Sequence, residues 1–440
     1  MRRIKLILLT GMVSVLMIGC GAKPAASTMA DTSAVSVAEQ DDEKKETEAP
    51  TIEEETTKKE ITEAETIQKT TADNGGNMQS VDGSLSDNIY SFQISIDGKI
   101  HQFPMKYSEF IAHGWEYDGD ENAVLDSMYK AGTQVFNKGK LQCYATVVNF
   151  DINAQPVNMS YITGITLEDR ENKGGVQIIM PKGIQLGIST REEIKAAYGE
   201  PTTDSNLDSG SSHYSYDRDV YQGVEFSFYA DKMELNKIEI NNIALPEDFE
   251  AGEVSGDVPE VVGKYQAPGE VSDDFSQFTV NYGEHIYRLP APVSEFEKNG
   301  WSIQEDKSDN QVAGRDFGWV TMMKDNQALK VIANNYSDQA TSIHNCFVKT
   351  VISDDRTKIP LVISGGITVG MNKEDVLKAL SNEEYEEKND SDLYTYYKVK
   401  PGTSSLDSYE IYIHKSDQKV YKIEVENSPK FNQIEKWLNQ

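Results

Sequence analysis

Histidines, cysteines and clustered carboxylates are the side chains of this 440-residue sequence that could act as catalysts or metal ligands. The six histidines are scattered, and none has a second histidine four residues further on, the spacing that sets two zinc ligands on one helical face. Motifs for a serine nucleophile, a redox-active cysteine pair and a phosphate-binding loop are absent from the sequence. We therefore expect no catalytic residue, no metal site and no cofactor.

Two acidic turns are similar to the start of a calcium-binding loop, in which oxygen ligands alternate along twelve residues. Asp118–Asn122 and Asp204–Asp208 supply such oxygens. The first turn has Ala123 at position six and Tyr129 at position twelve, where a calcium loop needs glycine and glutamate. The second turn has Ser215 at position twelve. We interpret both as solvated acidic turns.

Cys20 follows a segment typical of a secretory signal, with three basic residues and then an apolar run. This run is shorter than the roughly 20 residues of a membrane span. Gly19 directly precedes Cys20, which resembles the lipobox of bacterial lipoproteins, although Met17 stands where that family prefers leucine. The resemblance implies removal of residues 1–19, lipidation of Cys20 and an extracytoplasmic protein anchored in the cell membrane. The alternative is an ordinary secretory signal with an incidental cysteine.

Cys143 and Cys346 are the two remaining cysteines. They either form one disulfide or stay as isolated thiols. We favour isolated buried thiols, because a free cysteine packs as a small apolar residue.

Residues 20–84 have the composition of a disordered acidic tether. Between residues 21 and 80 there is no aromatic side chain, and 14 acidic residues face 6 lysines. Such a segment cannot bury enough apolar surface to offset the entropy lost on ordering. We interpret it as a spacer between the membrane and the folded part of the chain.

The net charge of the whole chain is −30, and its isoelectric point is about 4.6. Electrostatic binding of nucleic acid needs clustered Lys and Arg facing the phosphates. A basic patch on anionic lipid has the same requirement. We therefore expect no nucleic-acid partner, and contact with the membrane only through the lipid on Cys20.

An internal duplication dominates the rest of the sequence. Phe92–Trp115 and Phe278–Trp301 match without a gap, and eight of their 24 positions are identical. Further matches follow in the same order, pairing 183–187 with 366–370, 224–228 with 409–413, and 238–242 with 423–427. The sequence therefore predicts two tandem repeats, at residues 85–245 and 274–428.

Each repeat has the pattern of an α+β unit, an antiparallel sheet with one or two short helices packed on it. Alternating apolar residues predict strands, and Asp97-Gly98 predicts a tight hairpin turn. Ser108 is expected to cap a helix that ends at Gly114. Ser189 in the first repeat and Asn372 in the second are expected to cap a later helix.

The second part of each repeat, about residues 183–242 and 366–427, combines a Gly-x-x-x-Gly pattern, a capped helix and three strands. In this it resembles the module of the β-lactamase inhibitor proteins and of the BamE-type lipoproteins. Ser381-Asn382 departs from the Tyr-Gly-Glu-Pro stop of the first repeat. The whole layout is similar to cell-envelope lipoproteins of Gram-positive bacteria. The resemblance implies binding rather than catalysis, and it carries over no functional residue.

Two segments lie outside the repeats. Residues 246–273 are acidic and contain three prolines, which is typical of a linker. Residues 429–440 are predicted as a short helix with four apolar residues on one face, Phe431, Ile434, Trp437 and Leu438. We expect this helix to dock on the second sheet, and the alternative is a partner-binding tail.

Aromatic residues are the best candidates for a binding site, because Tyr and Trp combine a large contact area with a polar group. Trp115 and Trp301 recur in the same local pattern, so we assign both to the core. The candidate partner-binding residues are Phe317, Trp319, Tyr394 and Tyr396. A core position is the favoured alternative for Trp319, and Tyr394, Tyr396 and Tyr397 align loosely with Tyr214 and Tyr216.

These features together favour a non-catalytic, membrane-anchored module that binds a protein or a cell-wall component. The alternative is an extracytoplasmic enzyme with its site in a cleft between the two repeats. A transport receptor for a solute is a third reading, but the long alternating β-α units typical of that class are missing from the sequence.

Overall fold

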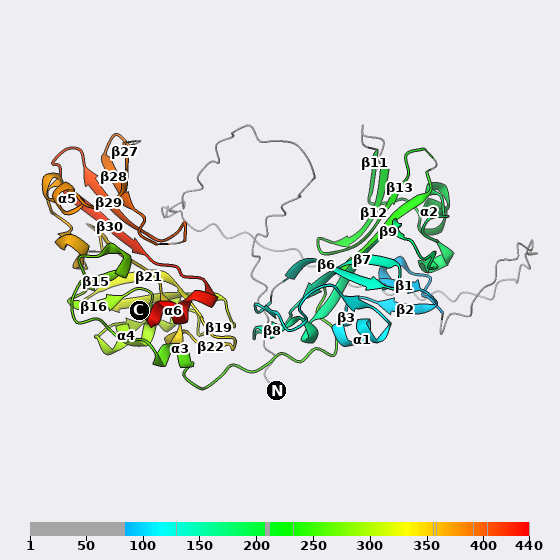
Figure 1. Cartoon of the computed structure of the whole chain (residues 1–440), viewed down its shortest axis with the longest axis horizontal. Coiled ribbons are helices and arrows are strands. Elements are labelled where there is room, and N and C mark those ends of the chain that lie inside the picture. Colours follow the sequence, from blue (N-terminus) through cyan, green and yellow to red (C-terminus); the bar gives the residue numbers. More distant parts are fainter. Residues whose placement is uncertain are drawn as a thin grey trace, which may run out of the picture. The chain divides into compact units, whose positions relative to one another are not determined.

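The computed structural model describes residues 84–439 except 129, 207–211, 232, 355, 358, 390 and 403. This part of the chain is mostly β-sheet with few short helices, which is compatible with the predicted α+β class (Figure 1). The predicted signal peptide, Cys20 and the tether as far as residue 83 lie outside the described residues.

The first half of the described chain forms antiparallel sheets. Its strands are β1 (Gln93–Ile96), β2 (Lys99–Gln102), β3 (Met105–Lys106), β4 (Glu116–Tyr117), β5 (Val124–Leu125), β6 (Lys130–Lys138), β7 (Leu141–Val148), β8 (Gln155–Pro156), β9 (Tyr161–Asn172), β10 (Ile178–Ile179), β11 (Thr203–Asn206), β12 (Ser212–Asp219), β13 (Gln222–Phe228) and β14 (Leu235–Asn242). Its helices are η1 (Ile89–Ser91), α1 (Tyr107–Ala112), η2 (Val157–Met159), η3 (Pro181–Gly183) and α2 (Arg191–Tyr198). The main sheet runs β11-β12-β13-β14-β9-β7-β6-β4, with β3 beside β9, and the smaller sheets are β10-β1-β2 and β5-β8.

The core of the first half lies between the main sheet and its helices. The predicted hairpin turn is confirmed, since Asp97 and Gly98 connect β1 to β2 with φ angles of 54° and 76°. Trp115 is 1 % exposed and stacks on Phe110 of α1 at 5.1 Å, which confirms its core position. Ser108 does not cap α1, because the helix begins one residue earlier, at Tyr107.

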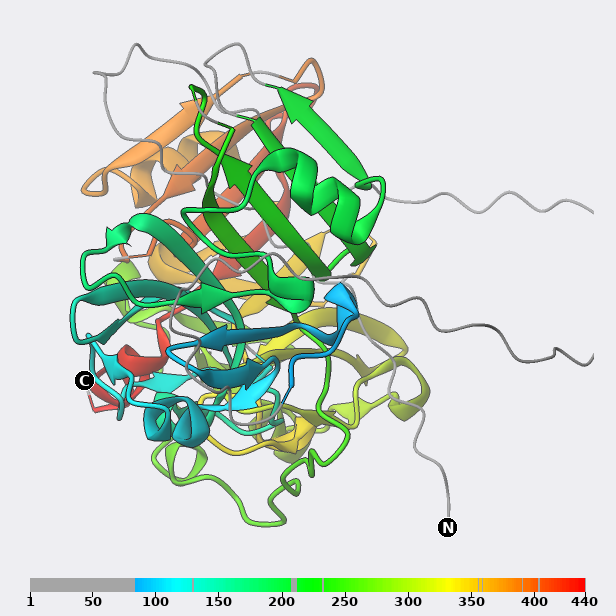
Figure 2. The same ribbon diagram turned by 90° about the vertical axis from the view of Figure 1, so that its right-hand side faces the viewer.

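Helix α2 lies across β12–β14 on one face of the sheet (Figure 2). Tyr198 at its end stacks on Phe226 of β13, with ring centroids 5.8 Å apart. The N-cap is Thr190 rather than the predicted Ser189. The Thr190 side chain and Glu193 form a capping box, whereas the Ser189 hydroxyl is occupied by the N–H of Gln185 at 3.0 Å.

The second half is also built mainly of antiparallel strands and short helices. Its strands are β15 (Thr279–Tyr282), β16 (His285–Arg288), β17 (Ala291–Pro292), β18 (Ser302–Ile303), β19 (Gln311–Val312), β20 (Phe317–Lys324), β21 (Gln327–Asn334), β22 (Thr341–Ser342), β23 (Phe347–Val348), β24 (Thr350–Asp354), β25 (Leu361–Ile363), β26 (Ile367–Thr368), β27 (Tyr385–Lys388), β28 (Tyr394–Val399), β29 (Ser408–His414) and β30 (Val420–Glu426). Its helices are α3 (Glu260–Gly263), η4 (Phe275–Gln277), α4 (Val293–Lys298), η5 (Glu305–Lys307), η6 (Ile343–Asn345), η7 (Ser364–Gly366), α5 (Lys373–Ala379), η8 (Phe431–Gln433) and α6 (Ile434–Leu438). The sheets run β16-β15-β25-β26, β17-β23-β21-β20-β18, β24-β30-β29-β28-β27 and β19-β22.

Trp301 is part of the core of the second half, as predicted. It is 3 % exposed and stacks on Tyr282 at 5.4 Å. Helix α5 begins after Asn372, as predicted, but no hydrogen bond from its side chain caps the helix. The buried residues of the two halves form separate apolar clusters, one within residues 89–240 and the other within residues 275–425.

The structure differs from a plain linker between residues 260 and 265. Helix α3 lies there, and its Val261 is buried in a small cluster with Tyr336, Phe347 and Ile434. Lys264 forms an ion pair with Glu435 of helix α6 at 2.9 Å. Apolar contacts and this ion pair therefore attach both α3 and α6 to the second half, in agreement with a docked C-terminal helix.

Each half contains a buried asparagine that binds a backbone carbonyl. Asn242 is the last residue of β14, and its Nδ2 donates to the carbonyl oxygen of Phe103 at 2.7 Å. Nδ2 of Asn427, directly after β30, donates to the carbonyl oxygen of Leu289 at 2.7 Å. Both asparagines are buried, so each half contains one buried hydrogen bond from an asparagine amide to a backbone carbonyl.

Candidate binding surface

The buried histidine of the first half has a structural role. His101 is fully buried, and its Nε2 accepts a hydrogen bond from Nε1 of Trp115 at 3.0 Å. Burial lowers the pKa of His101 to about 3, and the neighbouring His113 adds to this effect. The ring is therefore neutral and holds Trp115 in place.

Other reactive groups are equally inert in the described part of the chain. Cys143 and Cys346 are free and buried, as favoured, and burial raises the pKa of each thiol. No group of three His, Cys, Asp or Glu side chains there could hold a metal ion. In the first acidic turn, Asp120 accepts the N–H of Asn122 at 3.0 Å, which stabilises the turn itself.

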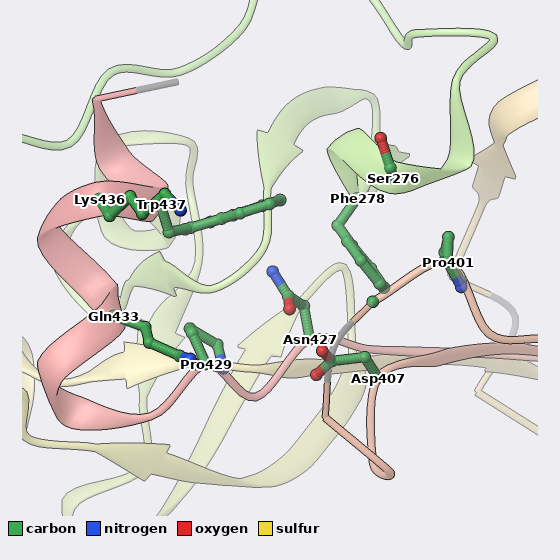
Figure 3. A pocket seen from close by; sticks show the side chains of 10 residues that line it. Ser276, Phe278, Pro401, Asp407, Asn427, Pro429, Gln433, Lys436 and Trp437 are labelled. Atoms are coloured by element: carbon green, nitrogen blue, oxygen red, sulfur yellow. The ribbon is translucent and has the colours of Figure 1, made fainter.

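Five cavities are each lined by residues of a single half. Figure 3 shows one of them, of about 250 Å³, with Asp407 and Asn427 below Phe278 and Trp437. The carboxylate of Asp407 accepts the N–H groups of Ser404 and Ser428 at 2.9 and 2.8 Å. These polar groups hold backbone in place, so the cavity carries no evident catalytic pair.

The sheet β24-β30-β29-β28-β27 offers the strongest candidate surface. Because side chains alternate along a strand, β28 points Tyr397 into the core and Tyr394 and Tyr396 to the opposite face. Helix α5 lies on the core side, where Lys373 approaches the ring of Tyr397 at 5.6 Å. The opposite face, which we call the outer face, carries the two tyrosines predicted from the sequence.

Five aromatic side chains gather on the outer face, and we call them the tyrosine cluster: Tyr394, Tyr396, Tyr412, His414 and Tyr421. Tyr412 contacts three of the rings, with centroids 5.4 Å from Tyr394, 4.9 Å from Tyr396 and 6.1 Å from Tyr421. His414 stacks on Tyr421 at 4.0 Å. All five are partly exposed, so they form a continuous aromatic patch that solvent can reach.

Glu410 fixes the tyrosine hydroxyls. Its Oε1 accepts hydrogen bonds from Tyr396 at 2.9 Å and from Nζ of Lys398 at 2.6 Å, and its Oε2 accepts one from Tyr412 at 2.8 Å. Burial opposes ionisation of Glu410, but the three bonds outweigh it and hold its pKa below the usual range. Burial, with the Glu410 charge, raises the pKa of Tyr396 and Tyr412. The rings are therefore oriented before any partner arrives.

Strands β12 and β13 of the first half pair in a similar register to β28 and β29 and carry smaller side chains at some positions of that face. Ser227 pairs with His213 as Tyr412 pairs with Tyr396. The core positions beside them stay aromatic or aliphatic in both halves. Three corresponding positions of the outer face differ, with His213 replaced by Tyr396, Ser227 by Tyr412 and Ser215 by Lys398. At the paired positions Tyr396 and Tyr412, the second half therefore carries two phenol rings that the first half lacks.

Phe317 and Trp319 form a separate patch on β20. Their exposed fractions are 56 % and 45 %, so Trp319 is not in the core, the position favoured for it from the sequence. The alternate residues Val320 and Met322 fill the core instead. Nζ of Lys330 lies 5.5 Å from the Trp319 ring. Among the described residues, no ring contact joins this pair to the tyrosine cluster.

Sequence reasoning missed Tyr412, His414, Tyr421 and Glu410 as parts of this surface. The signal for Tyr412 was present, because it alternates with the apolar residues Ile411 and Ile413 and must face the other way. Tyr421 carried no such signal, since the pairing of β29 with β30 shifts register there.

No protein-family model matches the chain, and no curated protein is significantly similar to it. Within the described residues, no helix has both the length and the apolar character needed to span a membrane.

Proposed function

We propose that this chain is a non-catalytic binding protein whose second half docks a protein partner on the tyrosine cluster. One observation carries the proposal. Tyr396 and Tyr412 face each other across two strands of the outer face, and His213 and Ser227 form the comparable pair in the first half. A structural requirement of the fold would apply to both halves, so these tyrosines serve something that only the second half does.

The geometry of the cluster suits a protein partner. The cluster lines none of the five cavities, so a small molecule would have little enclosure there. Tyrosine is enriched in protein interfaces because its ring buries a large area while its hydroxyl still forms hydrogen bonds. The ring contacts and the bonds to Glu410 restrict the side chains in advance, which reduces the entropy lost on binding.

The charges around the cluster are balanced, although the chain as a whole is strongly acidic. Lys398 is paired with Glu410 at 2.6 Å, and Lys422 with Glu424 at 2.8 Å. Nζ of Lys422 also lies 4.7 Å from the centre of the Tyr412 ring. A neutral centre avoids the repulsion that the rest of the chain would exert on an acidic partner.

The test is capture of envelope proteins on the immobilised chain. Tyr412→Ser restores the residue of the first half and should weaken capture of a specific partner by about 30-fold, the effect of losing an interface hot spot. Tyr144→Ser on β7 removes a half-buried tyrosine of the first half and serves as the matched control. A partner bound equally by both variants, or lost equally from both, would count against the tyrosine cluster.

We also propose that the folded part arose by duplication of one α+β unit, giving tandem repeats at 85–245 and 274–428. Residues 246–273 connect them, and 429–440 form a C-terminal helix. The match of Asn242 with Asn427, each bound to a backbone carbonyl at 2.7 Å, supports this proposal beyond the sequence identities.

The proposed location is the outer surface of a bacterial, Gram-positive-type cell membrane, with a lipid on Cys20. The basic and apolar residues of 1–19 and the Gly19-Cys20 pair support it. Metabolic labelling with a palmitate analogue should mark the wild type and the Cys143→Ala control, and Cys20→Ala should lose the label. Continued labelling of the Cys20→Ala variant would exclude lipidation at this residue.

A further inference from the structure

Arg288, the last residue of β16, is a cation that has no anionic partner among the described residues. The chain contains 72 acidic residues, yet none forms an ion pair with Arg288 in the described residues. Its Nε and Nη2 atoms are buried and have no hydrogen-bond partner there. Arg288 as a whole is only partly buried and its charge is unpaired, so an anion that approached this guanidinium would be bound favourably.

The surroundings hold the Arg288 side chain in place. Its guanidinium lies 4.1 Å from the centre of the Trp437 ring on α6, a cation–π contact. The backbone N–H of Arg288 donates to the hydroxyl of Tyr265 at 3.1 Å. Figure 3 shows Trp437 extending from α6 toward Phe278, whose ring it meets edge-on at 5.9 Å. Burial lowers the pKa of Arg288, as expected for a cation with little solvation.

A cavity of about 930 Å³ opens beside this arginine. Its wall is formed by the segment 264–274, by η4, β15 and β16, and by the end of α6 with Asn439. Lys264 adds a second positive charge, although that charge is shared with Glu260 and Glu435. The cavity is large enough to admit a short peptide end.

We propose that this cavity binds the C-terminal carboxylate of a short peptide, with Arg288 as the residue that recognises the anion. Ser272, Gln277 and Asn439 line the same cavity and offer hydroxyl and amide groups for peptide hydrogen bonds. Glu270 and Asp274 also line it, and their charges disfavour a dianion such as phosphate more than a single carboxylate. This site is distinct from the tyrosine cluster and goes beyond the function proposed above.

The experiment is a titration of the full chain with trialanine, measured by calorimetry and by tryptophan fluorescence, to which Trp437 contributes as one of four tryptophans. Trialanine amide, which lacks the carboxylate, should bind at least about tenfold more weakly, the worth of a charge-assisted hydrogen bond. Arg288→Gln should show the same loss, whereas Arg288→Lys keeps the charge and should retain part of the affinity. Arg170→Gln, at an exposed pair with Glu168, is the control and should bind as the wild type does.

Several outcomes would overturn the site. The site is overturned if trialanine and its amide bind equally, or if Arg288→Gln binds trialanine as tightly as the wild type does. It is also overturned if inorganic phosphate binds more tightly than trialanine, or if millimolar trialanine does not bind. If Arg288→Gln fails to fold, the acid–amide comparison and Arg288→Lys decide the question. Tyr412→Ser should leave trialanine binding unchanged, so failure of the tyrosine cluster and failure of this cavity give different results.

Discussion

The buried hydrogen bond of Asn427 gives a direct measure of how the second half is held together. Asn427 is 3 % exposed, and its Nδ2 donates to the carbonyl oxygen of Leu289, which is fully buried. Replacing Asn427 with Ala removes the donor and leaves the carbonyl oxygen of Leu289 without this hydrogen bond. Asn242→Ala makes the matched change in the first half, where the acceptor is the carbonyl of Phe103.

The expected loss is the cost of a buried acceptor left without its partner, about 1–3 kcal/mol in free energy of unfolding. Each 1.4 kcal/mol corresponds to tenfold in the unfolding equilibrium constant, so amides that exchange by global opening should exchange roughly 5- to 150-fold faster. Because the two apolar clusters are separate, each variant should affect only its own half.

Hydrogen exchange followed by mass spectrometry resolves the halves, since peptides from β13 and β14 report on the first and peptides from β29 and β30 on the second. Asn427→Ala should accelerate exchange of the slowest amides in the second set, and Asn242→Ala in the first. An acceleration below twofold would refute the assignment of these bonds as stabilising. Equal acceleration of both sets by either variant would show that the halves do not unfold separately.

Three further outcomes follow from burial and charge. Trp301→Ala should cost about 3–5 kcal/mol of stability because it empties a stacked core site, while Trp319→Ser should change stability by under about 0.5 kcal/mol, as measured by urea unfolding. A loss from Trp319→Ser as large as that from Trp301→Ala would place Trp319 in the core. The pKa of His101 falls from about 6.5 in the unfolded chain to about 3 in the folded one, so the unfolded state binds the extra proton and stability is lost as pH falls from 6.5 toward 3. His101→Gln should make the loss of first-half stability at low pH shallower, and His213→Gln should leave it unchanged. Identical pH profiles of stability for the two variants would contradict a buried neutral His101 ring.

Much of the fold could be predicted because local patterns determine it. The Asp97-Gly98 turn forms as expected, since a tight hairpin needs two residues that tolerate positive φ. The burial of Trp115 and Trp301 followed from their recurrence in one pattern, because a core position constrains the residue more than a surface position does.

Helix caps were harder to predict, because neighbouring residues offered equivalent chemistry. Both Ser189 and Thr190 can accept a backbone N–H, and the choice depended on which of them another group already occupied. Gln185 occupies the Ser189 hydroxyl, and Glu193 completes the box with Thr190. That competition involves a loop whose conformation is set by tertiary contacts, so the local sequence could not resolve it.

The tyrosine run at 394–397 shows why a surface can be located from sequence but not oriented. Tyrosines occupy both even-numbered and odd-numbered positions of this strand, so alternation alone cannot say which of them face the core. The neighbouring strand decides, because Tyr397 pairs with the buried Ile411 and Tyr396 with the half-exposed Tyr412. By the same register Tyr397, and not Tyr394 or Tyr396, corresponds to Tyr214, which pairs with the buried Phe226. Tyr396 therefore corresponds to His213 and not to a tyrosine of the first half, and its binding role is argued from this difference together with what it contacts on the outer face.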